Sequence, residues 1–191
     1  MKNIFIITVI LLFVSCHSEK EKQQPIFGIV IHGGAGTILK ENMSDEMEKA
    51  YIEKLTEAIK TGHAILKAGG TSQDAVEKTI HVMENSPLFN SGQGAVLTAN
   101  GTIALDASFM DGKTLNSGAI AGVKHVKNPI SAAIKVMHNS PHVLLSGEGA
   151  DQFAAEQNLD TVPESYFITE RRIKALERVK QLENNKKRSK R

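Results

Sequence analysis

The sequence predicts an α+β fold that forms only one half of a larger layered structure. The predicted elements run strand, two helices, antiparallel strands, helix, strand and helix, which is typical of a sheet covered by helices. Four short strands over this length leave sheet edges without partners. We therefore expect further strands to come from polypeptide outside this chain.

Residues 1–15 have the pattern of a signal peptide. Lys2 precedes an apolar run from Ile4 to Val14, which is roughly half as long as a transmembrane helix needs to be. We expect this segment to direct export and to be removed from the mature protein.

The segment that ends at Cys16 resembles a bacterial lipobox. It reads Phe13-Val14-Ser15-Cys16, with phenylalanine where leucine is usual. Cys16 is the only cysteine of the chain, so an intramolecular disulfide is impossible. We expect a lipid on the Cys16 thiol, a polar tether over residues 16–25, and a bacterial protein that is either a membrane-anchored lipoprotein or periplasmic.

The folded region is expected to span residues 26–183 and to begin with a strand at Ile26–Ile31. This run is mostly β-branched and aromatic, as expected of a strand buried on both faces. It leads into His32-Gly33-Gly34-Ala35-Gly36, where three glycines indicate unusual backbone angles or a close approach. We interpret His32 as a structural residue, with a catalytic base as the alternative.

Two amphipathic helices are predicted next, because apolar residues recur at helical spacing. The first begins after Ser44, a residue type favoured as an N-cap, and ends at Gly69-Gly70. The second begins at Thr71 or Ser72 and ends before Pro87.

A hairpin is predicted in the middle of the chain. Apolar and polar residues alternate from Ile103 to Phe109, and a turn at Met110–Lys113 returns the chain through Ala119–Val123. Beyond it we expect a helix that opens at Asn128-Pro129, a strand at His142–Leu145, a short helix after Gly147-Glu148-Gly149, and a charged helix over about 169–182 with Ile173, Leu176 and Val179 inward.

The distribution of charge argues against a nucleic-acid-binding protein. The chain has a net charge of +2, and five positive side chains lie within residues 186–191, so the rest is slightly acidic. A basic surface is the usual sign of nucleic-acid binding. We expect residues 184–191 to form a basic, disordered linker.

The common catalytic and cofactor motifs do not occur in this sequence. Gln152 stands where a dinucleotide-binding loop that opens at Gly147 needs its third glycine. His138 and His142 have the spacing of a zinc pair, but Pro141 lies between them and breaks the helix that would align them. The nucleophile elbow G-x-S-x-G is also missing.

Several longer strings are specific in combination and in order. They are Phe27–Ile31 with His32-Gly33-Gly34-Ala35-Gly36, Pro87-Leu88-Phe89-Asn90-Ser91-Gly92-Gln93-Gly94-Ala95, Leu105-Asp106-Ala107, Met110-Asp111-Gly112, Gly118–Val123, Asn128-Pro129-Ile130, and Ser140–Leu145 with Gly147-Glu148-Gly149-Ala150. Together they resemble the isoaspartyl peptidase/L-asparaginase family of plant-type asparaginases. The resemblance extends from about Phe27 to Arg172.

The resemblance implies the αββα sandwich of the N-terminal-nucleophile (Ntn) hydrolases, of which this chain supplies the N-terminal half only. In these enzymes a precursor cleaves itself before a threonine, whose hydroxyl is the nucleophile and whose freed amine, with a pKa near 8, is a base within reach. That threonine opens a Gly-Thr-Val-Gly string, which this sequence lacks. Gly36-Thr37, Gly70-Thr71 and Gly101-Thr102 are its only Gly-Thr pairs, and we interpret them as structural.

The implied function is that of the α-subunit, or N-terminal fragment, of a hydrolase that releases ammonia from L-asparagine and cleaves β-aspartyl (isoaspartyl) peptides. The implied partner is a β-subunit of the same precursor, which carries the threonine and joins the α-subunit in an (αβ)2 heterotetramer. The alternatives are a glycosylasparaginase-type amidase with the same fold and an inactive truncated lipoprotein.

The resemblance also implies supporting residues, although no catalytic residue proper lies in this chain. Asn90 would be a hydrogen-bonding partner of the nucleophile, and Gly33 and Gly34 would form a mobile loop beside it. A structural sodium ion, with no other cofactor, would be held by main-chain oxygens, which suit a hard cation. The sodium residues are Met83, Glu84, Ser86, Phe89, Ser91 and Gln93.

Overall fold

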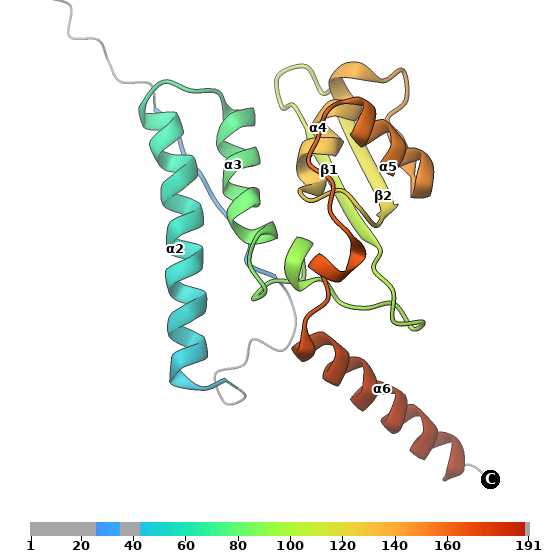
Figure 1. The fold of residues 1–191 in the computed structure, drawn as a ribbon. Helices are drawn as coiled ribbons and strands as arrows, with labels where there is room; N and C mark the ends of the chain where they lie inside the picture. Colours follow the sequence, from blue (N-terminus) through green and yellow to red (C-terminus); the bar gives the residue numbers. More distant parts are fainter. Residues whose placement is uncertain (1–25, 35–42, 190–191) are drawn as a thin grey trace, which may run out of the picture.

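The structure is a computed structural model that describes residues 26–34 and 43–189. Helices α2 and α3 lie side by side, a small sheet with α4 and α5 lies next to them, and α6 points away from the body (Figure 1). The elements are α2 (Asp45–Lys67), α3 (Ser72–Glu84), η3 (Gly92–Gly94), β1 (Leu105–Met110), β2 (Ser117–Val123), α4 (Pro129–Asn139), β3 (Leu144–Ser146), α5 (Gly147–Glu156), η4 (Glu164–Tyr166) and α6 (Glu170–Arg188).

Helices α2 and α3 begin where their N-cap residues predict. The Ser44 side chain accepts the N–H of Met47 at 3.3 Å, and Thr71 Oγ1 accepts the N–H of Asp74 at 3.0 Å. The two helices touch at Gly62, where a Cβ atom would lie 2.3 Å from Thr79 Oγ1. Both predicted helices are therefore confirmed, and a glycine permits their close contact.

The sheet has the strand order β1-β2-β3, and its hairpin is the one predicted. Strand β1 pairs antiparallel with β2, from Leu105 opposite Val123 to Met110 opposite Ser117, and β3 pairs parallel with β2. Helix α4 presses on β2 at Gly118, where a Cβ atom would lie 2.2 Å from the carbonyl oxygen of Ala133. The core between sheet and helices contains the fully buried side chains of Ile103, Ile120, Val123, Val126, Val136 and Phe167.

The opposite face of the sheet is open in this structure. Ser108 and Leu144 both lie opposite Ala119 in the pairing, so these three side chains share one face. Met110 and Leu144 on this face are 58% and 55% exposed. The sheet is thus covered by helices on one side only within the described residues.

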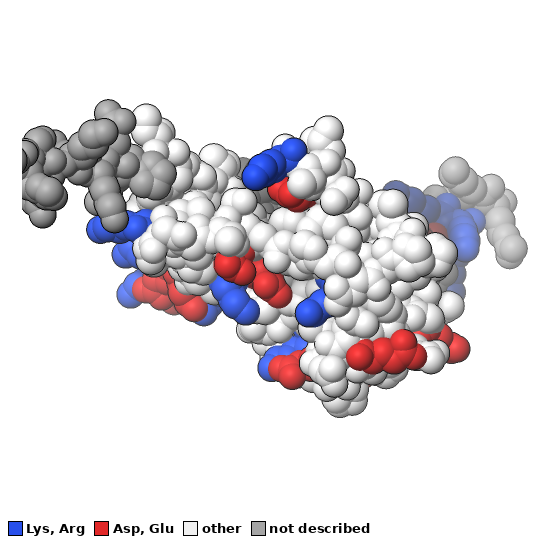
Figure 2. Space-filling model, turned by 90° about the horizontal axis from the view of Figure 1, so that it is seen from above, with Lys and Arg blue, Asp and Glu red and all other residues white. Residues whose placement is uncertain are grey.

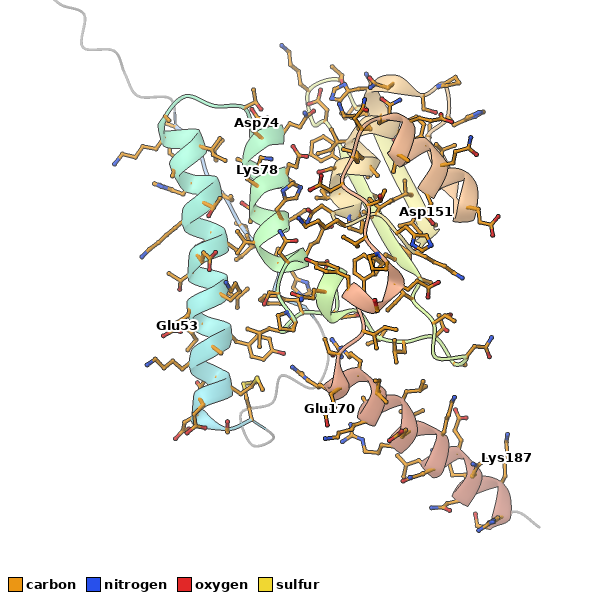
Figure 3. The ribbon with its side chains drawn as sticks, in the orientation of Figure 1. Glu53, Asp74, Lys78, Asp151, Glu170 and Lys187 are labelled. Atoms are coloured by element: carbon orange, nitrogen blue, oxygen red, sulfur yellow. The ribbon has the colours of Figure 1, made fainter. Side chains whose placement is uncertain are left out.

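Helix α5 is attached to the sheet by a carboxylate. Asp151, labelled in Figure 3, accepts the N–H of His125 at 2.9 Å and that of Lys124 at 3.0 Å. Val126 next to them forms an isolated bridge with Thr161. The chain after β2 is therefore held by α5 and by the segment that precedes α6.

The predicted strand at Ile26–Ile31 is wrong as a sheet strand buried on both faces. The segment is extended but pairs with no described strand, and its exposure alternates. Phe27 contacts the ring of His63 on α2, with ring centroids 5.2 Å apart, whereas Ile26 and Val30 are 104% and 94% exposed. The reason is that one face of the segment packs on α2 and α3, whereas the other face has no described neighbours. Its backbone also has no partner strand among the described residues.

The C-terminal end also differs from the prediction. Helix α6 continues to Arg188, so residues 184–188 of the expected disordered linker are helical. Ile173 and Val179, predicted to face inward, are exposed because α6 leaves the body after its first turns (Figure 1). The run of Lys, Arg, Glu and Leu in this segment favours a helix without tertiary support.

The molecular surface carries both signs of charge. Figure 2 shows acidic and basic side chains interspersed in small groups over the face it presents, with no continuous basic area there. On the face shown, no large patch of one charge sign creates a strong electrostatic potential that would attract an oppositely charged partner.

Candidate functional site

The loop that follows α3 contains most of the predicted site residues, and it is folded tightly on itself. Gly92 has a φ of +52°, and a Cβ atom there would lie 2.2 Å from the carbonyl oxygen of Glu84. A Cβ atom at Gly94 would lie 2.3 Å from the carbonyl oxygen of Phe89. Because a side chain fits at neither position, this loop requires both glycines.

The predicted sodium residues Met83, Glu84, Ser86, Phe89, Ser91 and Gln93 all lie in this loop or at its junction with α3. Met83 O accepts the N–H of Ser86 at 3.1 Å, and Ser91 O accepts that of Gly94 at 3.3 Å. Each carbonyl oxygen has a second lone pair for another donor or for a cation. The side-chain donors that bind main-chain oxygens of the loop bind Leu88 O and Gly94 O, which are outside the predicted set.

Asn90, predicted to adjoin the nucleophile, is exposed at the tip of the loop. Its Oδ1 accepts the N–H of Val96 at 2.8 Å, so the orientation of the amide group is defined. Among the described residues no acceptor contacts its Nδ2, which leaves this donor for another group.

Gly33 and Gly34 lie at the end of the extended segment. A Cβ atom at Gly33 would lie 2.9 Å from Leu55 of α2. Gly34 has a φ of +119°, an angle that favours glycine, and nothing lies within 4 Å of its Cβ position. The structure thus gives a conformational reason for glycine at position 34, and it packs Gly33 against α2.

The side chain of Glu84 is a feature that the sequence interpretation missed. It is buried, and its carboxylate accepts the N–H of Ile130 and the Nδ2 of Asn128, each at 3.0 Å. Burial raises the pKa of this carboxyl to about 7, and the two hydrogen bonds oppose that shift. A sequence separation of 46 residues between Glu84 and Ile130 gave no local signal for this contact.

A second polar cluster joins α3 to α4 next to Glu84. The Ser131 hydroxyl donates to Glu77 and lies 2.7 Å from His81 Nε2. Burial, as the largest cause, and nearby Lys78 lower the pKa of His81. Because the hydroxyl donates its proton to a carboxylate rather than to the imidazole, the cluster has the geometry of a structural network and not of an activated nucleophile.

The first turn of α6 supplies a third set of contacts that sequence reasoning missed. Arg172 Nε donates to Gly94 O at 2.6 Å, and both terminal nitrogens of Arg171 lie 3.2 Å from the hydroxyl of Tyr51. That hydroxyl donates to Leu88 O at 2.6 Å. The sequence shows two arginines shortly after Thr169, but nothing in the local sequence indicates which residues they bind.

The Gly-Thr pairs within the described residues are structural, as expected. Thr71 caps α3, and its hydroxyl also bonds to Asp74 at 2.7 Å. The hydroxyls of Thr102 and Thr98 are 2.8 Å apart.

Gly36-Thr37 and Cys16 lie outside the described residues. Within residues 26–34 and 43–189, no three His, Cys, Asp or Glu side chains gather as metal ligands.

Comparison with known proteins gives consistent matches. The model of a protein family described as Asparaginase matches residues 23–191. The isoaspartyl peptidase of Salmonella typhimurium is 48% identical over 148 residues, which cover 78% of this chain and 47% of the relative. The isoaspartyl peptidase/L-asparaginase of Mus musculus is 43% identical over 152 residues, 80% of this chain and 45% of the relative.

The plant-type L-asparaginase of Pyrococcus furiosus is 49% identical over 152 residues, which cover 80% of this chain and 47% of the relative. The chain therefore spans a little under half the length of these curated relatives.

We predict that Glu84→Gln flattens the pH dependence of stability. A carboxyl with a pKa near 4.5 when unfolded and about 7 when folded binds more protons in the folded state. Its contribution to stability is complete below pH 4.5 and is lost as the pH rises through 7, by up to about 3 kcal/mol. Urea unfolding of the wild type and the variant between pH 4.5 and 8 measures the difference, and parallel curves would contradict the assignment.

Proposed function

This chain belongs to the asparaginase family, and we propose that it is the N-terminal portion of a hydrolase that releases ammonia from L-asparagine and cleaves β-aspartyl peptides. The observation that carries the proposal is the 43% to 49% identity, over about four-fifths of the chain, to proteins named isoaspartyl peptidase or L-asparaginase. The match also confirms the resemblance that the motif strings indicate.

The reaction requires a nucleophile from polypeptide beyond this chain. A threonine at the start of a β-subunit, freed by self-cleavage of a common precursor, supplies a hydroxyl and an adjacent amine base. Asn90, whose Oδ1 is occupied by Val96, offers its Nδ2 to that threonine or to the oxygen on which charge develops. The described residues thus support and orient the site and do not attack the substrate.

The open face of the sheet supports an assembly with a second subunit. Met110 and Leu144 are exposed there beside small residues of β2, which is the surface that a second sheet needs for close packing. The extended segment at 26–34 also has an exposed apolar row, with Ile26 and Val30 in it. Both surfaces become buried in an αββα sandwich within an (αβ)2 heterotetramer.

The loop after α3 binds a sodium ion in this proposal. In support, side-chain donors bind Leu88 O and Gly94 O, so none of them occupies a carbonyl oxygen of the predicted set. Oxygen atoms suit a hard cation. The ion holds the loop backbone, and Met83, Glu84, Ser86, Phe89, Ser91 and Gln93 supply the carbonyl oxygens.

The activity is tested on the protein produced with the coding sequence that follows codon 191. We expect ammonia from L-asparagine and free aspartate from β-aspartyl dipeptides, whereas the 191-residue chain alone releases neither. Hydrolysis of N-acetylglucosaminyl-asparagine in preference to both would favour the glycosylasparaginase alternative. A stop codon without a Gly-Thr-Val-Gly string in frame would favour the inactive lipoprotein, and activity of the chain alone would refute the missing nucleophile.

We expect sodium to stabilise the loop. Replacement of NaCl by tetramethylammonium chloride at constant ionic strength should lower the unfolding temperature by a few degrees, because a ligand that binds only the folded state stabilises it. Choline chloride serves as a second control cation. Equal unfolding temperatures in all three salts would remove the sodium site from the proposal.

The lipid anchor is proposed from Cys16 alone. No helix in the part of the chain that the structure describes has the length and apolar character to cross a membrane. We expect Cys16→Ser to move the protein from the membrane fraction to the soluble fraction and to abolish labelling with radioactive palmitate. Retention of the variant in membranes, or a wild type that takes up no label, would rule out the anchor.

A further inference from the structure

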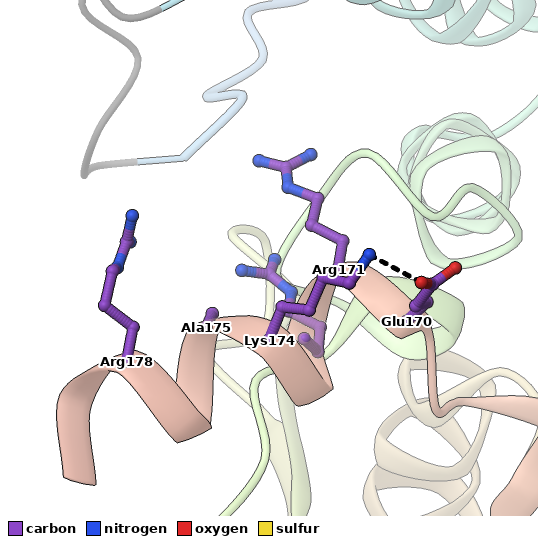
Figure 4. Close-up of a pocket in the computed structure, with 6 residues that line it drawn as sticks. Glu170, Arg171, Lys174, Ala175 and Arg178 are labelled. Atoms are coloured by element: carbon purple, nitrogen blue, oxygen red, sulfur yellow. Dashed lines mark ion pairs between the residues drawn. The ribbon is translucent and has the colours of Figure 1, made fainter. Parts of the chain in front are cut away.

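Two contacts hold the loop after α3 on either side of Asn90. One lies at Leu88, two residues before Asn90, and the other at Gly94, four residues after it. Both lead to consecutive residues in the first turn of α6, Arg171 and Arg172, and Figure 4 shows Arg171 at this end of the helix. The tip of the loop is therefore held at two points by one turn of one helix.

The contact at Leu88 passes through Tyr51 of α2. The hydroxyl of Tyr51 donates to Leu88 O at 2.6 Å and accepts from both terminal nitrogens of Arg171 at 3.2 Å. A cation on the acceptor side of a phenol strengthens the bond that the phenol donates. The buried ring of Tyr51 also packs edge-on against Phe89, with centroids 5.7 Å apart.

The contact at Gly94 is direct. Arg172 is half-buried, and its Nε donates to Gly94 O at 2.6 Å, the short distance of a charge-assisted hydrogen bond. Gly94 in turn lies against the carbonyl oxygens of Phe89 and Pro87. A displacement of Gly94 would thus move the residue that precedes Asn90.

We propose that Tyr51, Arg171 and Arg172 form a clamp of positioning residues, through which the docking of α6 determines the conformation of the loop that carries Asn90. The inference rests on the proposed function, in which Asn90 serves the nucleophile. After its first two turns, in which Leu176 lies near Gly101, α6 leaves the body (Figure 1). Any event that displaces α6 therefore releases both contacts together, and α6 regulates the site.

The test uses the protein assembled with its β-subunit and compares Tyr51→Phe, Arg171→Met and Arg172→Met with a matched control. Arg178→Met is that control, since Arg178 lies about two turns further along α6 (Figure 4). Tyr51→Phe keeps the aromatic contact with Phe89 and removes only the hydroxyl.

Hydrogen exchange reports the loop directly. The N–H of Val96 is protected by its bond to Asn90 Oδ1, so we expect each clamp variant, and not Arg178→Met, to accelerate its exchange at least tenfold. Two controls separate this effect from a general loss of stability. The unfolding temperature should stay close to that of the wild type, and the amides of α4 in the core should keep their exchange rates.

Kinetics report the consequence for the reaction. We expect kcat to fall on the order of 10-fold in each clamp variant with KM changed less than about twofold, because a displaced partner of the nucleophile affects the reacting geometry more than binding. Arg172→Lys should restore part of kcat by donating to Gly94 O. Tyr51→Phe and Arg171→Met should be non-additive, because both act through Leu88 O.

The outcomes are distinct. If the wild type is active and the clamp variants match Arg178→Met in kcat and in Val96 exchange, the clamp proposal is overturned. Accelerated exchange with unchanged kcat also overturns it, because the loop then does not govern the reaction. A wild type that hydrolyses none of the substrates but shows accelerated exchange in the variants refutes the proposed function, while the control of the loop by α6 stands.

Discussion

The buried side chain of Glu84 is the contact on which the arrangement of this protein depends. Its carboxylate accepts the N–H of Ile130 in the first turn of α4 and the Nδ2 of Asn128, and its carbonyl lies against Gly92 in the loop. One residue thus joins the pair α2–α3, the loop and the sheet layer. A carboxylate at a helix N-terminus is favourable, but its burial is costly, and the raised pKa reflects the balance.

From this junction the contacts of the loop continue to α6. Tyr51 on α2 and Arg172 on α6 bind carbonyls on opposite sides of Asn90. The loop is therefore held by its own glycines, by α2 and by α6. In the proposed function, such a loop would organise the supporting residues before a second subunit brings the nucleophile.

Several parts of the fold were accessible from local sequence, and others were not. Ser44 and Thr71 marked the helix starts correctly, and the alternation from Ile103 to Phe109 marked β1. The strand at Ile26–Ile31 was wrong as a buried sheet strand because a strand is defined by its neighbours. For the site, the strings around Asn90 indicated the loop, whereas Glu84, Tyr51 and Arg172 gave no signal because their partners are 37 to 78 residues distant.

The local sequence by itself determined the helix caps, the hairpin and the glycines of the loop, and it was sufficient to identify the family. These depend on backbone angles and hydrogen bonds among residues close in sequence, so the order of side chains is sufficient to specify them. Tertiary structure decided which carboxylate caps α4, which carbonyls receive Tyr51 and Arg172, and which faces stay open. Such contacts join distant segments, and the free energy of burying them depends on neighbours that no local pattern contains.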